Sequence, residues 1–362
     1  MTRLLITGGL GFLGLEAAKH FLRRGLSWSP TMGCPRELTR ITLFDYDFPD
    51  APLPEEVTSD ERVQVQTGDF SDPAIAAELV HDEDHEPGDL SIIHLASMVS
   101  GNTEADPVHG WAVNVEGTRN LLNACAEQAP GARFLFASST ATFGPVGADD
   151  PPSSDSTKQL PQNTYGMHKV ICEMMLNDYS RRGHVDARGL RLPVIVVRPG
   201  GPNAALTTCW SSVVREPLAG SPCTLPVPAD RPLPVASYGA AVRGMAHMLL
   251  KVSASDLGAD RTTQLPALSL SPRQLYDAAA NLAKEASARG GGPPLPLGQL
   301  IEAPQEVAVR VAGGMGATVD AARGLALGLS ADASAESIVE DYARDYAPSV
   351  HLPSLVDSRP KP

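Results

Sequence analysis

The chain has 362 residues, of which 43% are hydrophobic, and its formal net charge is −13 at pH 7. This length and composition indicate one large globular domain or two closely joined ones. The negative charge argues against nucleic acid or an anionic membrane as a partner, because both bind clustered positive surfaces. An anionic small substrate would need arginines within its own site.

Five cysteines are scattered along the chain without C-x-x-C spacing, at Cys34, Cys125, Cys172, Cys209 and Cys223. This pattern favours a reducing compartment, so we expect a cytoplasmic protein. No apolar run reaches the ~18 residues of a membrane span. The N-terminal stretch is broken by glycines and lacks a signal-peptide pattern, so it is interpreted as mature structure.

His81 and His85 stand four residues apart among acidic residues, which is one arrangement of metal ligands. The alternative is a solvated, charge-rich loop. The segment has no apolar face, so the sequence favours the loop and no metal site.

Strands and helices alternate along the first half of the chain. We expect strands at residues 3–7, 41–44, 63–66, 91–96, 133–137 and 189–197, and helices at residues 15–24, 112–125 and 165–181. Residues 27–37 hold two prolines and a glycine and predict a surface loop. The alternation predicts an α/β fold with a Rossmann-type doubly wound parallel sheet.

The pattern changes beyond Pro199, where prolines crowd residues 222–234, residues 290–296 form a loop, and only short helices are expected. We expect a dinucleotide-binding domain over residues 1–198 and a smaller substrate-binding domain over residues 199–350, some elements of which return to the first domain. Residues 351–362 are expected to fray.

A glycine loop, Gly8, Gly11 and Gly14 with Phe12 and Leu13 between them, follows the first strand and opens the first helix. Backbone N–H groups at such a helix start meet the pyrophosphate of a dinucleotide. The alternative is a tight glycine turn without a ligand.

Acidic residues follow the next two strands. Asp45 is placed to accept bonds from the adenosine ribose and to repel a 2′-phosphate, which favours NAD over NADP; Asp47 is the competing candidate. Asp69 and Phe70 are placed to meet the adenine, and Leu95, Ala96 and Ser97 line the cofactor from the end of the fourth strand. The alternative is that these are ordinary residues at strand ends, with no role in binding a cofactor.

Tyr165 and Lys169 lie four residues apart and therefore share one face of a helix. A neighbouring ammonium lowers a phenol's pKa, and an oxidised nicotinamide ring would lower it too, so Tyr165 is a candidate general base. Ser139 follows a strand whose end points into the ligand crevice, and it is the candidate catalytic hydroxyl, whereas Ser138 or Thr140 could be simple turn residues.

In this order the motifs resemble the extended short-chain dehydrogenase/reductase family. They are the T-G-x-x-G-x-x-G loop, Asp45, Gly68-Asp69, His94-Leu95-Ala96-Ser97, Asn114-Val115-Glu116-Gly117-Thr118, Ser138-Ser139 and Tyr165-x-x-x-Lys169. The resemblance implies that Ser139, Tyr165 and Lys169 are catalytic and that Lys169 also holds the nicotinamide ribose. It further implies that Asn114 supports the proton path and that Pro193 contacts NAD.

The second half is similar to a narrower group, the D-erythronate dehydrogenases. The similarity lies in Val99-Ser100-Gly101, Asn177 to Gly183, Arg191-Leu192-Pro193, Val197 to Gly200, Pro202-Asn203, Val214 to Gly220 and Asp320 to Arg323. Val194 and Gly201 depart from that group, which usually has threonine and lysine there. Each departure removes a polar contact near the active site. The resemblance therefore implies the fold and the cofactor more directly than it implies a four-carbon acid as the substrate.

This resemblance implies NAD-dependent oxidation of the C2 hydroxyl of a small sugar acid to the 2-oxo acid. Arg198, Asn203 and Arg215 are candidates to bind the substrate, and Ser100 and Thr140 are further ones; the two arginines could instead be structural ion-pair partners. The alternatives are a nucleotide-sugar epimerase or dehydratase that keeps NAD bound, and an NAD-binding sensor without turnover. We also expect a homodimer formed through the helices at 112–125 and 165–181.

Overall fold

The computed structural model describes residues 2–24, 37–81, 87–147, 149–201, 206–290 and 296–347. Most of the predicted loop at 27–37 lies outside these residues, as do Cys34, His85 and Asn203. The expected tail at 351–362 also lies outside them.

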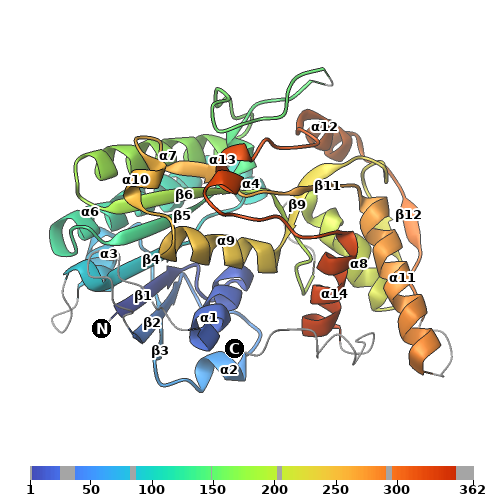
Figure 1. The fold of residues 1–362 in the computed structure, drawn as a ribbon, viewed down its shortest axis with the longest axis horizontal. Coiled ribbons are helices and arrows are strands. Elements are labelled where there is room, and N and C mark those ends of the chain that lie inside the picture. Colours follow the sequence, from blue (N-terminus) through green and yellow to red (C-terminus); the bar gives the residue numbers. More distant parts are fainter. Residues whose placement is uncertain are drawn as a thin grey trace.

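A seven-stranded sheet forms the left half of the molecule in Figure 1. Its strands are β1 (Thr2–Thr7), β2 (Leu38–Asp45), β3 (Val63–Thr67), β4 (Leu90–His94), β5 (Arg133–Ser139), β6 (Asp186–Leu192) and β10 (Thr262–Gln264). They are ordered β10-β6-β5-β4-β1-β2-β3, and every neighbouring pair is parallel. This is the predicted doubly wound α/β fold. The direction in which successive strands are added to the sheet reverses between β1 and β4.

Helices cover both faces of this sheet, because successive side chains of β1 point to opposite sides. Leu4 and Ile6 pack with α1 (Phe12–Arg24) and α9 (Tyr238–Leu250). Leu5 packs on the other face, whose core includes residues of α3 (Pro73–Val80), α6 (Thr118–Gln128) and α7 (Thr164–Arg181). Burial on both faces explains the near-continuous apolar runs of the strands.

Short elements connect these layers. They are α2 (Glu55–Thr58), η1 (Pro87–Asp89), α4 (Ser100–Ala105), α5 (Pro107–Trp111), η2 (Ala112–Gly117) and η3 (Thr140–Thr142). The element η2 is a π-helical turn, so the helix expected at 112–125 begins with wider hydrogen-bonding than an α-helix. Such insertions in helices often occur at functional sites.

The single strand expected at residues 189–197 is wrong. The segment forms β6, in the seven-stranded sheet, and β7 (Val194–Val196), in a separate three-stranded sheet. Pro193 lies between them, and it has no N–H to donate to a ladder. The proline therefore ends one strand and lets the chain turn into another sheet.

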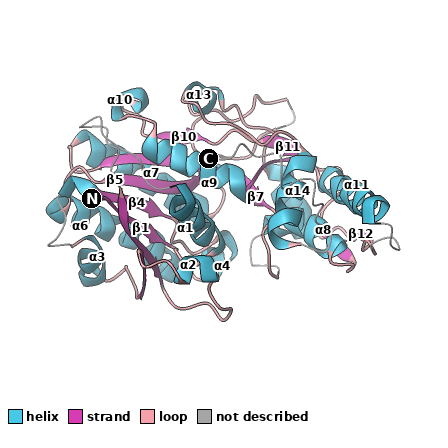
Figure 2. Cartoon of the chain, turned by 60° about the horizontal axis from the view of Figure 1, so that its bottom comes forward, coloured by secondary structure: helices cyan, strands magenta, loops and turns pink. Residues whose placement is uncertain are grey.

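The remaining elements form a second lobe, at the right of Figure 2. Its strands are β7, β9 (Leu233–Ser237) and β11 (Leu268–Leu270), with β8 (Cys223–Leu225) paired to β12 (Leu300–Glu302). Its helices are η4 (Leu206–Thr208), α8 (Cys209–Leu218), α11 (Pro272–Gly290), α12 (Glu306–Gly314) and α14 (Ala335–Tyr346). The expectation of only short helices here is wrong, since α11 has 19 residues.

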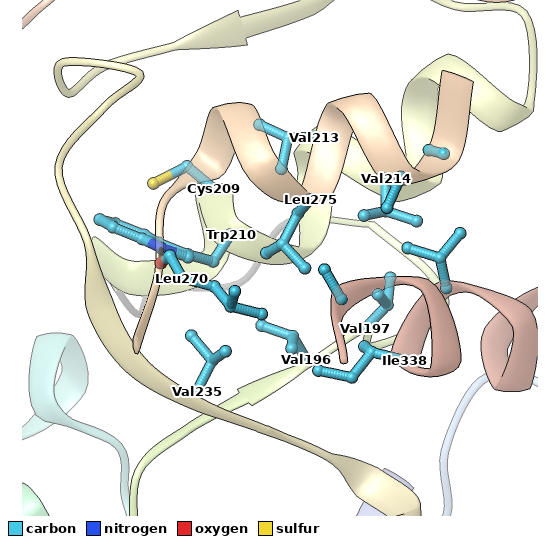
Figure 3. Close-up of a cluster of buried hydrophobic side chains, with 14 of the residues drawn as sticks. Val196, Val197, Cys209, Trp210, Val213, Val214, Val235, Leu270, Leu275 and Ile338 are labelled. Carbon is cyan, nitrogen blue, oxygen red and sulfur yellow. Dashed lines mark hydrogen bonds between the residues drawn. The ribbon is translucent and has the colours of Figure 1, made fainter. Parts of the chain in front are cut away.

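This lobe has a hydrophobic core of its own, shown in Figure 3. Trp210 and Val213 of α8 pack there with Leu275 of α11 and Ile338 of α14. The buried indole N–H of Trp210 donates to the Leu270 carbonyl at 3.1 Å. A buried tryptophan N–H requires such a partner, so the contact orients α8 against β11.

The chain returns to the first lobe after residue 199. Helix α9 packs in the core beside β1, and β10 extends the seven-stranded sheet by pairing with β6. Two short helices flank this return, α10 (Ala254–Leu257) and α13 (Ala322–Ala326). The division into domains at residue 198 stays a prediction. Helix α9 and strand β10 follow this residue in the chain but pack in the first lobe.

Candidate active site

A cavity of about 1520 Å³ opens where the carboxyl ends of the parallel strands meet the second lobe. In doubly wound sheets this edge is where ligands bind. The glycine loop, the end of β5 and the start of α7 all line the cavity. Residues from Arg198 onward close it from the second lobe.

Almost every predicted site residue in the described part of the chain lines this cavity. They are Gly8, Gly11, Phe12, Leu13, Gly14, Asp45, Asp69, Phe70, Leu95, Ala96, Ser97, Ser100, Ser139, Thr140, Tyr165, Lys169, Pro193, Arg198 and Arg215. Asn114 is the exception, and Asn203 lies outside the described residues. Segments far apart in the sequence are thus brought to one site.

The glycine loop has room for backbone only. Gly8 has a φ of +68°, and a Cβ there would lie 2.8 Å from the Ala96 nitrogen. A Cβ on Gly14 would lie 2.3 Å from the Gly8 carbonyl oxygen. The loop can therefore bring its N–H groups and the start of α1 close to a phosphate, and these residues fit the pyrophosphate of a dinucleotide.

Of the two acids that competed for the ribose, Asp45 reaches the cavity and Asp47 does not. The Asp45 carboxylate accepts the backbone N–H of Leu10 at 3.1 Å and that of Tyr46 at 2.9 Å. It therefore ties the end of β2 to the glycine loop. Asp47 is exposed and accepts only the N–H of Phe48 among the described contacts.

Ser139 and Tyr165 both line the cavity. The Ser139 hydroxyl accepts the Ala141 N–H at 3.1 Å. Helix α7 can approach this turn because residue 166 is glycine: a Cβ on Gly166 would lie 2.1 Å from the Ala141 oxygen. A residue with no side chain thus allows the start of α7 to lie against the turn that follows Ser139.

Burial raises the pKa of Tyr165 to about 12, and the Ser139 hydrogen bond opposes this with a smaller effect. The sequence suggested that Lys169 lowers this pKa. Its ammonium lies 5.3 Å from the tyrosine ring centroid and donates to the Ala137 carbonyl at 2.8 Å. In the protein alone, desolvation of the phenol therefore decides the direction in which its pKa moves.

Lys169 is buried, with its ammonium 4.5 Å from the centroid of the Phe136 ring. Burial lowers the pKa of Lys169 to about 8, while Cys172 and Glu173 raise it by smaller amounts. A buried ammonium is unfavourable for folding. The ammonium of Lys169 therefore lowers the free energy of unfolding, although the predicted catalytic mechanism requires this lysine.

We expect Lys169→Met to increase the free energy of unfolding at pH 7 by about 1–3 kcal/mol, because the buried charge disappears. The folded pKa of about 8 lies below the ordinary 10.5, so the unfolded wild type binds more protons between these pH values. Wild-type stability should rise across that window, and the advantage of the variant should fade. Urea unfolding at pH 7 and pH 10 measures both quantities.

Lys158→Met serves as the matched control, since Lys158 is exposed and lies outside the cavity lining. Its unfolding free energy should stay near that of the wild type at both pH values. A Lys169→Met protein that is less stable than the wild type at pH 7 would contradict the argument.

Asn114 lies on η2, and its side-chain amide contacts the loop that follows β4 and, at 3.4 Å, His168 of α7. Its oxygen accepts the Met98 N–H at 2.7 Å and the Ser97 hydroxyl at 3.1 Å, and its nitrogen donates to the Met98 carbonyl at 3.1 Å. The structure therefore places this side chain behind the cavity wall. It holds residues that line the cavity.

A buried ionic network behind the site was not predicted. Glu173 accepts hydrogen bonds from the Ser138 hydroxyl and from Arg191, whose Nη2 lies 2.7 Å from Oε2. Arg191 also contacts Asp155 at 3.0 Å, and Asp155 accepts the Thr263 hydroxyl at 2.6 Å. The network joins β5, β6, β10 and α7 to the loop between β5 and α7.

One signal in the sequence could have revealed Glu173. It follows Lys169 by four residues and so continues the buried face of α7. Arg191 and Asp155 offered no such signal, because ion pairs between distant segments depend on the tertiary fold. Within the described residues, no helix is long and apolar enough to cross a membrane, and no metal-ligand cluster is present.

Comparisons with known proteins agree with this geometry. Residues 4–256 match the NAD dependent epimerase/dehydratase family. The D-erythronate dehydrogenase of Cupriavidus necator is 41% identical over 284 residues, covering 78% of this chain and 83% of the relative. That of Haemophilus influenzae is 36% identical over 273 residues, covering 75% and 80%.

Among solved structures, a nucleoside-diphosphate-sugar epimerase from Agrobacterium tumefaciens superposes with a TM-score of 0.80 at 31% identity. The match covers 96% of this chain and 95% of that structure. The family model covers more than half of the chain, and its residues include the glycine loop, Ser139, Tyr165 and Lys169. This chain therefore belongs to the NAD dependent epimerase/dehydratase family and uses NAD as its cofactor.

Proposed function

We propose that this protein is a dehydrogenase that oxidises the C2 hydroxyl of a small sugar acid, of the D-erythronate type, to the 2-oxo acid. The observation that carries the proposal is that Ser139, Tyr165 and Lys169 line the same cavity as the glycine loop. The D-erythronate dehydrogenases, at 41% and 36% identity, support the substrate class.

In this proposal Tyr165 takes the hydroxyl proton, and Ser139 hydrogen-bonds the reacting oxygen. When bound, NAD would supply the hydride acceptor and a cationic ring that favours the phenolate. The protein alone holds the pKa of Tyr165 near 12, so a positive charge beside the phenol is what makes the base usable at neutral pH. Lys169 supplies one such charge and binds the nicotinamide ribose.

Arg198 is proposed to bind the substrate carboxylate. It is exposed and lines the cavity, and within the described part of the chain no acid pairs with its guanidinium. The pKa of Arg198 is lowered by burial and by the nearby charge of Arg215. An anion between these two residues would relieve that repulsion, and arginine binds carboxylates in a bidentate manner.

Arg215 is buried, and the structure already uses several of its donors. It donates to the Arg198 carbonyl at 2.8 Å, the Ser212 hydroxyl at 3.0 Å and the Glu216 carboxylate at 2.6 Å. We therefore assign Arg215 mainly to holding the Arg198 backbone. Asn114 likewise is proposed to position the loop at Ser97 and Met98, through which it supports the site.

The direct test measures NADH formation by the full-length protein with NAD and a panel of aldonic acids, including D-erythronate and L-threonate. We expect turnover with at least one of them and a clear preference for NAD over NADP, because Asp45 repels a 2′-phosphate. Silence across the panel from a protein that retains NAD through purification would favour the nucleotide-sugar epimerase instead. NAD binding with no turnover of either substrate class would favour the sensor.

The outer face of α7 supports a homodimer. Its Met167 and Met174 have 40% and 51% of their surface exposed, and Trp111 and Val108 of α5 are exposed nearby. Apolar patches of this kind often mark protein interfaces. The outer face of α6 is polar, with Arg119, Asn123 and Glu127 exposed, so the expected interface narrows to α5 and α7.

We expect Met174→Asp to convert a dimer into a monomer, because a desolvated carboxylate at an apolar interface is unfavourable. Light scattering at micromolar concentration measures the mass of both proteins. Glu127→Lys, on the polar face of α6, should leave the mass unchanged. A wild-type protein that is monomeric under these conditions would overturn the dimer.

The cytoplasmic assignment also remains a proposal. Cys125, Cys172, Cys209 and Cys223 are buried, and burial raises the pKa of each thiol. Such thiols are unreactive and fit a reducing compartment.

A further inference from the structure

We propose that the substrate of this enzyme carries two anionic groups, and that Arg310 of α12 binds the group remote from the reacting hydroxyl. This inference rests on the proposed dehydrogenase function and specifies its substrate class. The second group would be a phosphate ester or a carboxylate, since a guanidinium binds either one through the same pair of hydrogen bonds.

The charge inside the cavity differs from that of the whole chain. Although the net charge is −13, the described residues that the second lobe contributes to the cavity include Arg198, Arg215 and Arg310 and no acid. The acids in the lining all come from the first lobe. Asp45 ends β2, Asp69 follows β3, and Glu104 accepts the backbone N–H of Thr164.

The three arginines differ in their partners among the described residues. Arg215 pairs with Glu216, whereas no described contact gives Arg198 or Arg310 an acidic partner. Positive groups held in one concave site attract anions more strongly than the same groups on a convex surface. One monocarboxylate would pair with one of these two guanidiniums and leave the other without an acidic partner among the described residues.

Helix α12 turns one face toward the cavity. Val307, Arg310, Val311 and Gly314 all line it, at the spacing of a single helical stripe. Val307 and Val311 are 54% and 37% exposed, although the opposite face of the helix is buried. Apolar side chains that face a ligand cavity and remain uncovered are surfaces that a bound molecule would cover.

The position of this stripe is fixed by the fold. Ala308 and Ala312 pack into the core of the second lobe. At the end of α12 the Arg231 guanidinium binds the Ala312 carbonyl at 3.0 Å, the Gly313 carbonyl at 3.3 Å and the Met315 carbonyl. The Val146 N–H contacts the Gly314 carbonyl at 3.4 Å, which links α12 to the loop beyond Ser139.

The part of the cavity lining that the second lobe contributes is open at residue 201. Gly201 lines this part, and a Cβ there would meet nothing within 4 Å. Arg198, Thr207, Thr208 and Ser211 line the same cavity as the exposed stripe of α12. In this proposal a longer or phosphorylated acid reaches from Arg198 to Arg310.

The test compares matched substrate pairs with the full-length enzyme and NAD. One pair is D-erythronate and its 4-phosphate, and the other is D-gluconate and D-glucarate, so each pair differs by one anionic group. The variants are Arg310→Gln and, as control, Arg24→Gln, which replaces an exposed helical arginine outside the cavity lining. The values of kcat/KM are measured for all four acids.

We expect at least one dianion to exceed its monoanionic partner by about tenfold or more, the scale of one charge-assisted contact. Arg310→Gln should remove most of that preference and leave the monoanions within about twofold of the wild type, while Arg24→Gln changes neither. The pair that responds identifies the second group as phosphate or carboxylate. Equal kcat/KM within both pairs, or equal losses for all acids in Arg310→Gln, would overturn the inference.

Binding separates this inference from the dehydrogenase itself. If no acid is turned over, calorimetry measures the binding of the same four acids to the NAD-loaded protein and so tests the anion site alone. Tighter binding of a dianion that depends on Arg310 would support the anion site and overturn the proposed reaction. Binding that is the same for both members of each pair, or absent, would overturn the anion site.

Discussion

Turnover by the Tyr165→Phe protein is expected to fall by about 10²–10⁴-fold in kcat, the range of a lost general base. The substitution removes one oxygen and keeps the ring, so the phenylalanine should pack as Tyr165 does. The glycine loop and Asp45 are untouched, and NAD should bind with unchanged affinity. The loss should therefore be in kcat, measured as NADH formation with the acid that the wild type uses.

Tyr179→Phe is the matched control because it lies on the same helix. Its hydroxyl binds the Asn123 carboxamide oxygen and lies outside the cavity lining. We expect wild-type kcat for this variant. A Tyr165→Phe enzyme that keeps more than about a tenth of the wild-type kcat would show that another group takes the proton.

Arg191→Met is expected to lower the free energy of unfolding by about 3–5 kcal/mol, as found when one partner of a buried ion pair is removed. Arg191 is buried and lies within 3.0 Å of both Glu173 and Asp155. Its loss leaves two carboxylates without their counter-ion. Because Glu173 also holds Ser138, beside the predicted catalytic serine, kcat should fall as well.

Equilibrium unfolding in urea measures this loss, and Arg181→Met provides the control. Arg181 pairs with Asp178 at 2.5 Å, but 74% of its side chain is exposed. Exposed pairs contribute about 0–1 kcal/mol, so the control should be nearly as stable as the wild type. The double variant Arg191→Met, Glu173→Leu should recover part of the lost stability. If Arg191→Met alone changes the free energy of unfolding by less than about 1 kcal/mol, the network is not stabilising.

The sequence by itself determined the features that depend on neighbours along the chain. Buried parallel strands require continuous apolar runs, and β1, β5 and α7 lie close to where those runs and the helical spacing predicted them. The glycine loop was recognisable because only glycine allows the approach seen at Gly8 and Gly14. Tyr165 and Lys169 share a face for the same local reason, the pitch of a helix.

Only the tertiary structure decided the features that depend on partners distant in the chain. Pro193 divides an apolar run between two sheets, and β10 returns to pair with β6, because strand pairing is chosen by the whole core. The contact of Arg191 with Glu173 and Asp155, and the placement of Arg310 at the cavity, likewise join segments that no local pattern connects. Whether a charged side chain has a counter-ion or can bind a ligand depends on the groups that the fold places beside it. The spacing of residues along the chain does not show which groups these are.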